Sequence, residues 1–420
     1  MPLFTPADIL LPKCDLSKWS VIACDQYTAE PDYWMETEQV VGDAPSSLRL
    51  ILPEATLSTK PDDLDIMEAN NTMSQYLRDG ILETHPNAMV YIERKLNNGK
   101  IRRGILGKID LQDYDYHEHA SSPIRATEGT VAARIPPRVA VRKNAPCEFP
   151  HVMLLADDVQ NLIFDEIDTA HLPLLYDFPL MQEGGSIKGW LLSEQHVAKV
   201  MKGVDTLADP EFFCSRYQLT EGTPPLPFAV GDGNHSLATA KECYERQKKF
   251  LTPDQWDQIP ARYALVELVN LHDPGLDFAP IHRLLFNIDP EKFLMDFKRF
   301  LNQLPSSPHS AQSFYFTYGG ISGHFDCKNP THTLAVSTLQ AFLDQWIERH
   351  TSASIDYIHG DESLVALSKK PNCLGIFLPS LKKDELFPTV IAKGPLPRKS
   401  FSMGDANDKR FYLEGRKIRS

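Results

Sequence analysis

One stretch, residues 228–240, constrains the chain more than any other. It reads Phe-Ala-Val-Gly-Asp-Gly-Asn-His-Ser-Leu-Ala-Thr-Ala. Phe228–Val230 is a short apolar run that predicts the end of a buried strand. The glycines on either side of Asp232 let the backbone turn sharply, and apolar residues then recur at helical spacing. We therefore expect a strand, a glycine-rich turn and the start of a helix.

Such a turn suits an anionic ligand, because free N–H groups and the positive end of the helix dipole face outward at a helix N-terminus. Gly233, Asn234 and Ser236 are candidate phosphate contacts. Asp232 and His235 are candidate catalytic residues, and Asp232 is also a candidate metal ligand. The alternative is a purely structural turn, since Asp-Gly is a common turn signal. The spacing is neither a Walker loop nor a complete dinucleotide fingerprint.

The turn is similar to the Asp-Gly-x-His-Arg signature of the ParB/sulfiredoxin-like superfamily. The whole chain resembles a family of unknown function, the domain-of-unknown-function family numbered 1015, whose usual turn is Asp-Gly-His-His-Arg. Asp232, Gly233 and His235 match this pattern, whereas Asn234 and Ser236 replace the first His and the Arg. Without that Arg, the turn lacks the side chain that would grip a phosphate with two hydrogen bonds.

A second candidate segment is residues 125–142, which carries several arginines around one carboxylate, Glu128. The arginines are Arg125, Arg134, Arg138 and Arg142. Arginine is always charged and donates hydrogen bonds in a planar fork, so this composition suits a polyanionic ligand. The alternative is a basic surface helix with a Glu–Arg pair.

The same segment resembles the family's Arg-x-His-Glu-x-Thr motif. Arg125, Glu128 and Thr130 match it, and Thr127 stands where the family has a His. The resemblance implies that Arg125, Thr130 and Arg134 contact phosphate and that Glu128 is catalytic.

Three further segments supply candidate residues. Asp25 follows a strand predicted over 19–24, and ligands gather beyond strand ends in open α/β sheets. It is a candidate substrate contact, or alternatively a helix cap. His282 and Arg283 follow the strand predicted over 263–271 and match the family's Pro-x-His-Arg element; the alternative is a surface turn.

The last matching element lies in the tail, where Pro397, Lys399 and Ser400 fit the family's Pro-x-Lys-Ser pattern. Lysine and serine together can hold a phosphate as a point charge plus a hydroxyl. A solvated basic face is the alternative here. More widely, the basic stretch 393–419 is able to supply phosphate ligands.

The patterning predicts an α+β fold with mixed sheets and flanking helices, and the resemblance implies a ParB/sulfiredoxin-like core. Asn98-Gly99 predicts a hairpin of strands 89–96 and 101–111, and a second hairpin is expected over 151–157 and 161–167. Asp289 and Pro290 predict the N-terminal cap of a helix with Phe293, Phe297 and Leu301 on one face. The sequence pattern changes at this point, so we expect a core lobe at 1–288. A C-terminal α+β lobe at 289–420 would return its tail to the site.

Composition limits the class of protein. The chain has 420 residues, 42% hydrophobic and 24% charged, as in a globular protein. Its seven cysteines form no Cys-x-x-Cys pair, and there is neither a signal-peptide pattern nor a membrane-spanning run, so we expect a cytoplasmic protein with reduced thiols. The net charge of −13 disfavours a nucleic-acid partner. A homo-oligomer is compatible with the sequence.

The resemblance implies a nucleotide-dependent phosphotransferase acting on a small metabolite such as serine, because ParB-like free-serine kinases bind nucleotide phosphates at this turn. ATP or ADP would be the phosphate donor. The residue types fit: Arg283 and Lys399 would neutralise phosphate, Asp232 would hold Mg²⁺, and Glu128 or His235 would take the acceptor's proton.

Two other function classes stay open. One is a regulatory protein that binds a nucleotide without turnover. The other is a ParB-like nuclease or DNA-binding protein, which the acidic balance opposes. Sulfiredoxin-type chemistry is disfavoured, since no cysteine lies in the turn.

Overall fold

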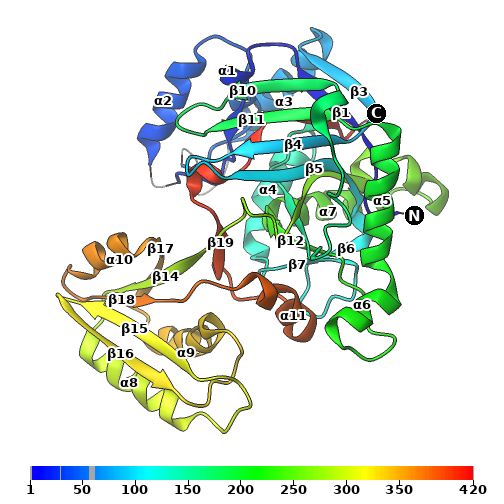
Figure 1. The fold of residues 1–420 in the computed structure, drawn as a ribbon. Coiled ribbons are helices and arrows are strands. Elements are labelled where there is room, and N and C mark those ends of the chain that lie inside the picture. The colour runs from blue at the N-terminus through cyan, green and yellow to red at the C-terminus, as the bar shows by residue number, and fades with distance from the viewer. Residues whose placement is uncertain (1, 29, 56–61, 420) are drawn as a thin grey trace. The chain divides into compact units, whose positions relative to one another are not determined.

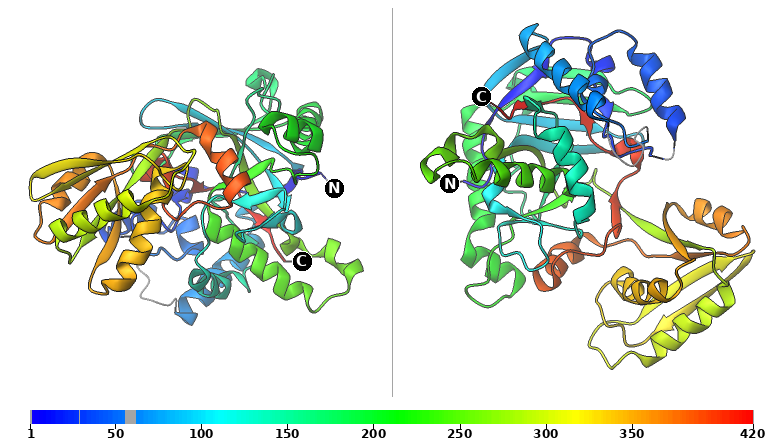
Figure 2. Two further views of the ribbon diagram at one scale, coloured as in Figure 1. Left: turned by 90° about the horizontal axis from the view of Figure 1, so that it is seen from below. Right: turned by 180° about the vertical axis from the view of Figure 1, so that it is seen from behind.

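The computed structural model of the chain describes residues 2–28, 30–55 and 62–419. The chain divides into two compact units, Met1–Leu276 with Ala406–Ser420 and Asp277–Asp405. Each contains helices and mixed or antiparallel sheets, which confirms the α+β class. The boundary expected between residues 288 and 289 falls within the second unit. The C-terminal segment from Ala406, red in Figure 2, belongs to the first unit.

The first unit is built on one large sheet (Figure 1). Its strands run in the order β10-β11-β4-β5-β13-β9-β12-β7-β6. The strands of this unit are β1 (Ala7–Pro12), β2 (Val21–Ile22), β3 (Leu82–Ala88), β4 (Val90–Lys95), β5 (Ile101–Asp110), β6 (Tyr114–Asp115), β7 (Ile124–Ala126), β8 (Cys147–Glu148), β9 (Met153–Ala156), β10 (Leu174–Pro179), β11 (Ser186–Leu191), β12 (Phe228–Asp232), β13 (Tyr263–Asn270), β20 (Phe411–Tyr412) and β21 (Arg416–Lys417). Its helices are α1 (Leu16–Trp19), α2 (Pro31–Val41), α3 (Asp63–Arg78), α4 (Ile135–Arg142), α5 (Glu194–Ala208), α6 (Pro210–Tyr217) and α7 (Asn234–Lys248).

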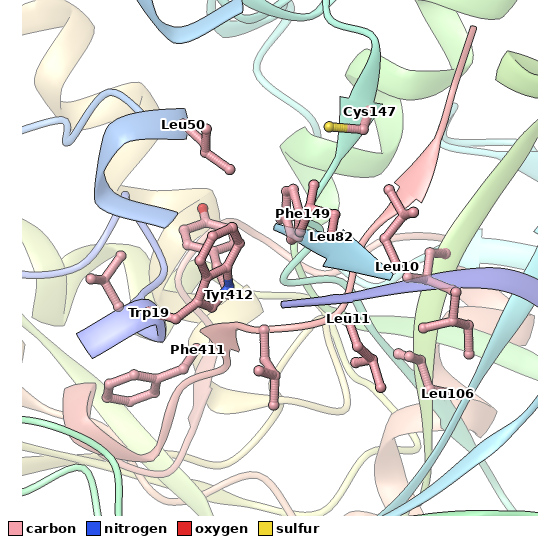
Figure 3. Packing of buried hydrophobic residues seen from close by; sticks show 14 of the residues in the cluster. Leu10, Leu11, Trp19, Leu50, Leu82, Leu106, Cys147, Phe149, Phe411 and Tyr412 are labelled. Atoms are coloured by element: carbon pink, nitrogen blue, oxygen red, sulfur yellow. The ribbon is translucent and has the colours of Figure 1, made fainter. Parts of the chain in front are cut away.

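Side chains alternate across the sheet, so its two faces bury different partners. On one face, Val90 and Ile92 join a cluster with Trp19 of α1 and Tyr412 of β20. On the other face, Tyr91 joins the cluster that the apolar sides of α5 and α7 complete. Figure 3 shows part of the first cluster, where Trp19, Phe149 and Tyr412 pack together.

Strand directions bring several chain segments to one edge of this sheet. β12 runs parallel to β7 and antiparallel to β9, with Asp232 paired to Met153. The carboxyl ends of β7 and β12 therefore lie at the same edge as the start of β9. This edge positions the glycine-rich turn.

The second unit has its own sheet, in the order β16-β15-β18-β14-β17, and β19 pairs with β14. Its strands are β14 (Phe278–Phe286), β15 (Gln312–Tyr318), β16 (Ile321–Cys327), β17 (Ser354–His359), β18 (Cys373–Phe377) and β19 (Phe401–Met403), and its helices are α8 (Pro290–Gln303), α9 (Ala335–Arg349), α10 (Asp361–Ser368) and α11 (Lys383–Lys393). Asp289 caps α8 by accepting the N–H groups of Glu291 and Lys292, as expected from the sequence.

Two local predictions are wrong. The strand expected over 19–24 is shorter, because α1 extends to Trp19 and leaves only Val21–Ile22 in β2. The hairpin expected over 151–157 and 161–167 does not form. β9 is its only strand, and the Asp158 carboxylate instead accepts the N–H groups of Leu162 and Ile163 at 2.8 and 2.9 Å. A side chain that caps the backbone in this way competes with strand pairing. The hairpin of β4 and β5 is confirmed.

Candidate functional site

The expected strand, turn and helix are present as β12, Gly233 and α7. Gly233 has φ 77°, a left-handed conformation that favours glycine. A Cβ atom there would also come within 3.0 Å of Val152 Cα, so the turn lies directly against the start of β9. Asp232 Oδ1 accepts the Gly233 N–H at 2.8 Å and holds the turn closed. The first turn of α7 thus presents its N-terminus at the sheet edge.

The loop after β7 lies beside this turn. Thr127 Oγ1 donates to the Val230 carbonyl at 2.6 Å, and the Val131 N–H donates to His235 Nε2 at 3.2 Å. Glu128 and Thr130 lie between these two anchors and are therefore held near the first turn of α7. Thr130 Oγ1 is buried without a hydrogen-bond partner among the described residues. Because His235 Nε2 accepts a backbone hydrogen bond, this nitrogen positions the loop.

α4 packs beside α7 (Figure 1). α4 also carries a row of arginines along one side. Arg134, at its N-terminal cap, Arg138 and Arg142 are spaced by four residues, so they share a helix face. All three line a cavity of about 460 Å³, together with Ser236 and Thr239 of α7. Its apolar walls are Leu50, Ile51, Met73, Val141 and Phe149. Arg134 and Ser236, from separate predicted motifs, are thus brought together.

The charges in the cavity are only partly balanced. Arg138 forms an ion pair with Glu54, and Arg142 with Glu148. Glu148 also lies 3.4 Å from Arg416, from the C-terminal segment. Arg134 is exposed and has no ion pair with any residue in the described ranges. The end of the cavity near α7 therefore carries a cation available to an anionic ligand.

The C-terminal segment contributes a second cation at the turn. Lys409 Nζ lies 3.4 Å from Asp232 Oδ2. The carboxylate of Asp232, the candidate metal ligand, therefore accepts the Gly233 N–H through Oδ1 and faces the Lys409 ammonium through Oδ2. The described residues contain no group of three His, Cys, Asp or Glu side chains placed to hold a metal ion. A single carboxylate can still bind Mg²⁺ when ligand phosphates supply other oxygens.

At one wall of the cavity, three side chains from distant segments meet through the Tyr412 hydroxyl. It lies 3.0 Å from His151 Nδ1 and 3.2 Å from Cys24 Sγ, and it accepts the Cys24 N–H at 3.1 Å. Burial raises the pKa of Cys24 to about 11, with a further contribution from Asp25. Cys24, His151 and Tyr412 all line the cavity.

Asp25, the candidate substrate contact, follows Cys24 at the end of the β2 segment. Its Oδ1 accepts a hydrogen bond from Gln26 Nε2 at 3.0 Å. Its charge also contributes to raising the pKa of Tyr412, after the larger effect of burial. Asp25 thus lies near the Cys24–Tyr412 contact, although it does not itself line the cavity.

Arg125 is buried and donates to backbone carbonyls. Its Nε donates to Ser122 O at 2.8 Å, and its Nη2 donates to Pro224 O and Pro225 O at 3.0 and 3.2 Å. Burial lowers the pKa of Arg125. These bonds tie β7 to the segment that precedes β12, a structural role. Phosphate binding by Arg125 stays a prediction.

The remaining predicted residues lie in the second unit. His282 is 1% exposed; its Nδ1 accepts the Leu378 N–H at 3.1 Å, and its Nε2 lies 2.8 Å from Asp361. Arg283 is fully buried and donates to Ile281 O at 2.7 Å and Lys399 O at 3.1 Å. These contacts join β14 to the 398–400 segment.

In that segment, Ser400 is buried and donates to Pro397 O at 2.5 Å, whereas Lys399 is exposed with φ 56°. Binding of phosphate by His282, Arg283, Lys399 or Ser400 stays a prediction.

Sequence reasoning missed several cavity residues. Arg138 was part of the noted arginine segment, and its four-residue spacing from Arg134 was the available signal. Cys24 and Tyr412 gave no local signal, because only the pairing of β2 with β20 brings them together. His151 gave no local signal either, because only the antiparallel pairing of β9 with β12 brings the start of β9 to the carboxyl end of β12.

Similarity to known proteins is found in solved structures and in one family profile. No curated protein matches its sequence. Similar solved structures include a conserved hypothetical protein from Pyrococcus furiosus, with 10% identity and a TM-score of 0.35 over 74% of this chain and 94% of that chain. SbnI with C-terminal truncation from Staphylococcus aureus has 9% identity and a TM-score of 0.35, over 71% of this chain and 82% of that one. Free serine kinase in complex with AMP has 9% identity and a TM-score of 0.38, over 74% and 91%.

Two further results concern membrane-spanning helices and the family of the chain. None of the helices within the described ranges has the length and apolarity needed to cross a membrane. The sequence profile described as "Protein of unknown function (DUF1015)" matches residues 6–346, which include the glycine-rich turn, the arginine segment and the His-Arg element. The chain therefore belongs to the DUF1015 family.

Proposed function

We propose that the cavity between α4 and α7 binds a nucleoside phosphate, and that the protein transfers a phosphoryl group from it to a small hydroxyl-bearing metabolite such as serine. The observation that carries the proposal is the composition of the cavity. Arg134 and the N-terminal turn of α7 lie at one end, and Leu50, Met73 and Phe149 form apolar walls.

The cavity has a cationic end and apolar walls, and these two parts suit the two parts of a nucleotide. The volume of about 460 Å³ is within the range of small-molecule pockets, about 300–1,000 Å³. Apolar walls suit a nucleobase, and a helix N-terminus with an arginine suits phosphate oxygens. Ser236 would donate its hydroxyl, and the Asn234 N–H would add to the positive end of α7, whereas the Gly233 N–H is already bonded to Asp232 Oδ1.

The transfer step needs charge neutralisation and a proton acceptor. Asp232 would hold Mg²⁺ together with ligand phosphate oxygens, and the ion would neutralise charge on the transferred group. Lys409, 3.4 Å from Asp232, would support the same phosphates. Glu128 is the preferred acceptor of the metabolite's proton, because His235 Nε2 already accepts the Val131 N–H.

A second candidate function is nucleotide binding without turnover. The pairing of Arg138 with Glu54 and of Arg142 with Glu148 favours it, because these ion pairs reduce the charge available to a transferring phosphoryl group. The two functions share the binding step and differ in turnover.

Thermal shift with ATP, ADP and CTP, with and without Mg²⁺, tests the binding step. A ligand at 100 times its Kd stabilises the native state by about 2.7 kcal/mol. We expect ATP or ADP to raise the Tm more than CTP does. Absence of a shift with every nucleotide at millimolar concentration would contradict the proposal.

Phosphorus NMR of the protein with ATP and a panel of hydroxyl metabolites then separates the two functions. Appearance of a phosphorylated metabolite supports transfer. Binding without any new phosphorus resonance supports the regulatory function and overturns transfer.

A further inference from the structure

His151 is held through one ring nitrogen, and its side chain lines the cavity. Its Nδ1 lies 3.0 Å from the Tyr412 hydroxyl, and the two rings meet edge to face at 79°. The side chain is buried, at 9% exposure, and lines the cavity. Its Nε2 makes no hydrogen bond to any described residue. The ring is therefore oriented by Tyr412, with Nε2 available to a ligand.

Its position in the chain places it beside the phosphate end of the cavity. Val152, the next residue, lies under Gly233 so closely that a Cβ there would come within 3.0 Å of Val152 Cα. Arg134 and Ser236 line the same cavity. An anion bound at the start of α7 would therefore be in the neighbourhood of His151.

The hydrogen bonds around Tyr412 accommodate either charge state of His151. The hydroxyl has one proton and accepts the Cys24 N–H at 3.1 Å in both states. When His151 is neutral with its proton on Nε2, Tyr412 donates to Nδ1. When His151 is protonated, its Nδ1–H donates to Tyr412, whose proton turns toward Cys24 Sγ at 3.2 Å.

The two partners keep their own protons during this exchange. Burial raises the pKa of Cys24 to about 11, so it stays a thiol near neutral pH. Burial also raises the pKa of Tyr412 well above its usual value. Any proton that this trio gains on ligand binding is therefore accepted by the His151 ring.

We propose that His151 donates from Nε2–H to a phosphate oxygen of the ligand and that ligand binding draws a proton onto its ring. This rests on the proposed function, because it needs an anion in the cavity. The charged groups around His151 are Arg134, Arg138 and Arg142, opposed by Glu54, Glu148 and Asp25, and Arg410, which is itself paired with Glu267 and Glu414. An anion bound beside the ring favours the imidazolium over the neutral imidazole, so ligand binding and proton uptake are coupled.

Isothermal titration calorimetry in two buffers of different ionisation enthalpy measures the protons taken up per ligand. Inorganic pyrophosphate and ADP are titrated separately into wild-type protein, His151→Gln and the matched control His171→Gln, an exposed histidine outside the cavity. Titration of the ligand itself is common to all three proteins and cancels in the difference.

We expect wild type and His171→Gln to take up the same number of protons. His151→Gln should take up fewer, by up to about one proton per ligand, and bind about tenfold more weakly. Equal proton uptake by wild type and a folded His151→Gln would overturn the inference while leaving nucleotide binding intact. Binding of pyrophosphate but not ADP, with proton uptake lost in His151→Gln, would support the inference and contradict the nucleotide proposal.

Wild-type protein provides a second measurement in case His151→Gln does not fold. Diethyl pyrocarbonate modifies accessible unprotonated imidazole nitrogens, and mass spectrometry locates the modified residue. His151 should be modified, and pyrophosphate should protect it. Modification that is unaffected by saturating pyrophosphate, or no pyrophosphate binding at all, would overturn the inference.

Discussion

Two regions of the molecule each carry a histidine together with an arginine that the sequence marks as a phosphate ligand, and the two regions use these side chains differently. In the second unit, His282 and Arg283 are buried, and their bonds reach Leu378, Asp361, Ile281 and the 398–400 segment. In the first unit, Arg134 and His151 line the cavity, and among the described residues Arg134 has no ion pair and His151 Nε2 no hydrogen bond.

The difference concerns what each polar atom already contacts. A buried guanidinium that donates to several carbonyls is needed for folding, because its loss leaves those buried acceptors without a donor. A cation on a cavity wall contributes little to folding and much to a ligand. We therefore expect changes in the second unit to alter stability and changes in the cavity to alter binding.

The largest expected effect is that of Arg283→Ala. The change removes the donors to Ile281 O and Lys399 O and the guanidinium 4.7 Å from the Tyr357 ring centre. We expect a loss of about 2–4 kcal/mol of unfolding free energy, because buried acceptors lose their partners. Urea denaturation measures it. Full stability combined with abolished nucleotide binding would instead assign Arg283 to the ligand site.

Arg134→Gln should produce the next largest effect, on binding. We expect nucleotide affinity to fall at least tenfold, about 1.4 kcal/mol, while the Tm without ligand changes little. The matched control is Arg78→Gln, an exposed arginine of α3 that does not line the cavity. An unchanged Kd for Arg134→Gln by calorimetry would remove Arg134 from the site.

Ser236→Arg should have a smaller effect of opposite sign. It restores the family's usual residue at a position that lines the cavity near Arg134. A guanidinium at the first turn of α7 can bind phosphate with two hydrogen bonds, so we expect the Kd to fall a few-fold. Weaker binding by the folded variant would indicate that the cavity is too crowded for this role.

The smallest expected effect is a pH dependence in the second unit. Burial lowers the pKa of His282 from 6.5, despite the opposing influence of Asp361. A base with a lowered folded pKa contributes stability that is present above its unfolded pKa and lost as the pH falls below about 6.5. His282→Gln should reduce the slope of stability against pH just below 6.5. His332, whose pKa burial also lowers, remains in both proteins, so only the difference between them is informative.

Local patterns predicted the strand, turn and helix at 228–248, the β4–β5 hairpin and the cap at Asp289 because each depends on neighbouring residues. Arg134 and Ser236 were candidates from their sequence segments, and both line the cavity. The contact of Cys24, His151 and Tyr412 was not, because it depends on the pairing of β2 with β20 across almost the whole chain. The predicted hairpin does not form after β9, because the Asp158 carboxylate accepts the N–H groups of Leu162 and Ile163 although the apolar pattern there favours a strand.

Hydrogen–deuterium exchange with and without ATP or ADP tests the central claim most directly, because it locates the bound ligand without a substitution. The account predicts that nucleotide slows exchange at the first turn of α7 and along α4, with smaller changes around His151. Protection confined to the second unit, or nucleotide binding with no change at α4 and α7, would contradict the assignment of the site to this cavity.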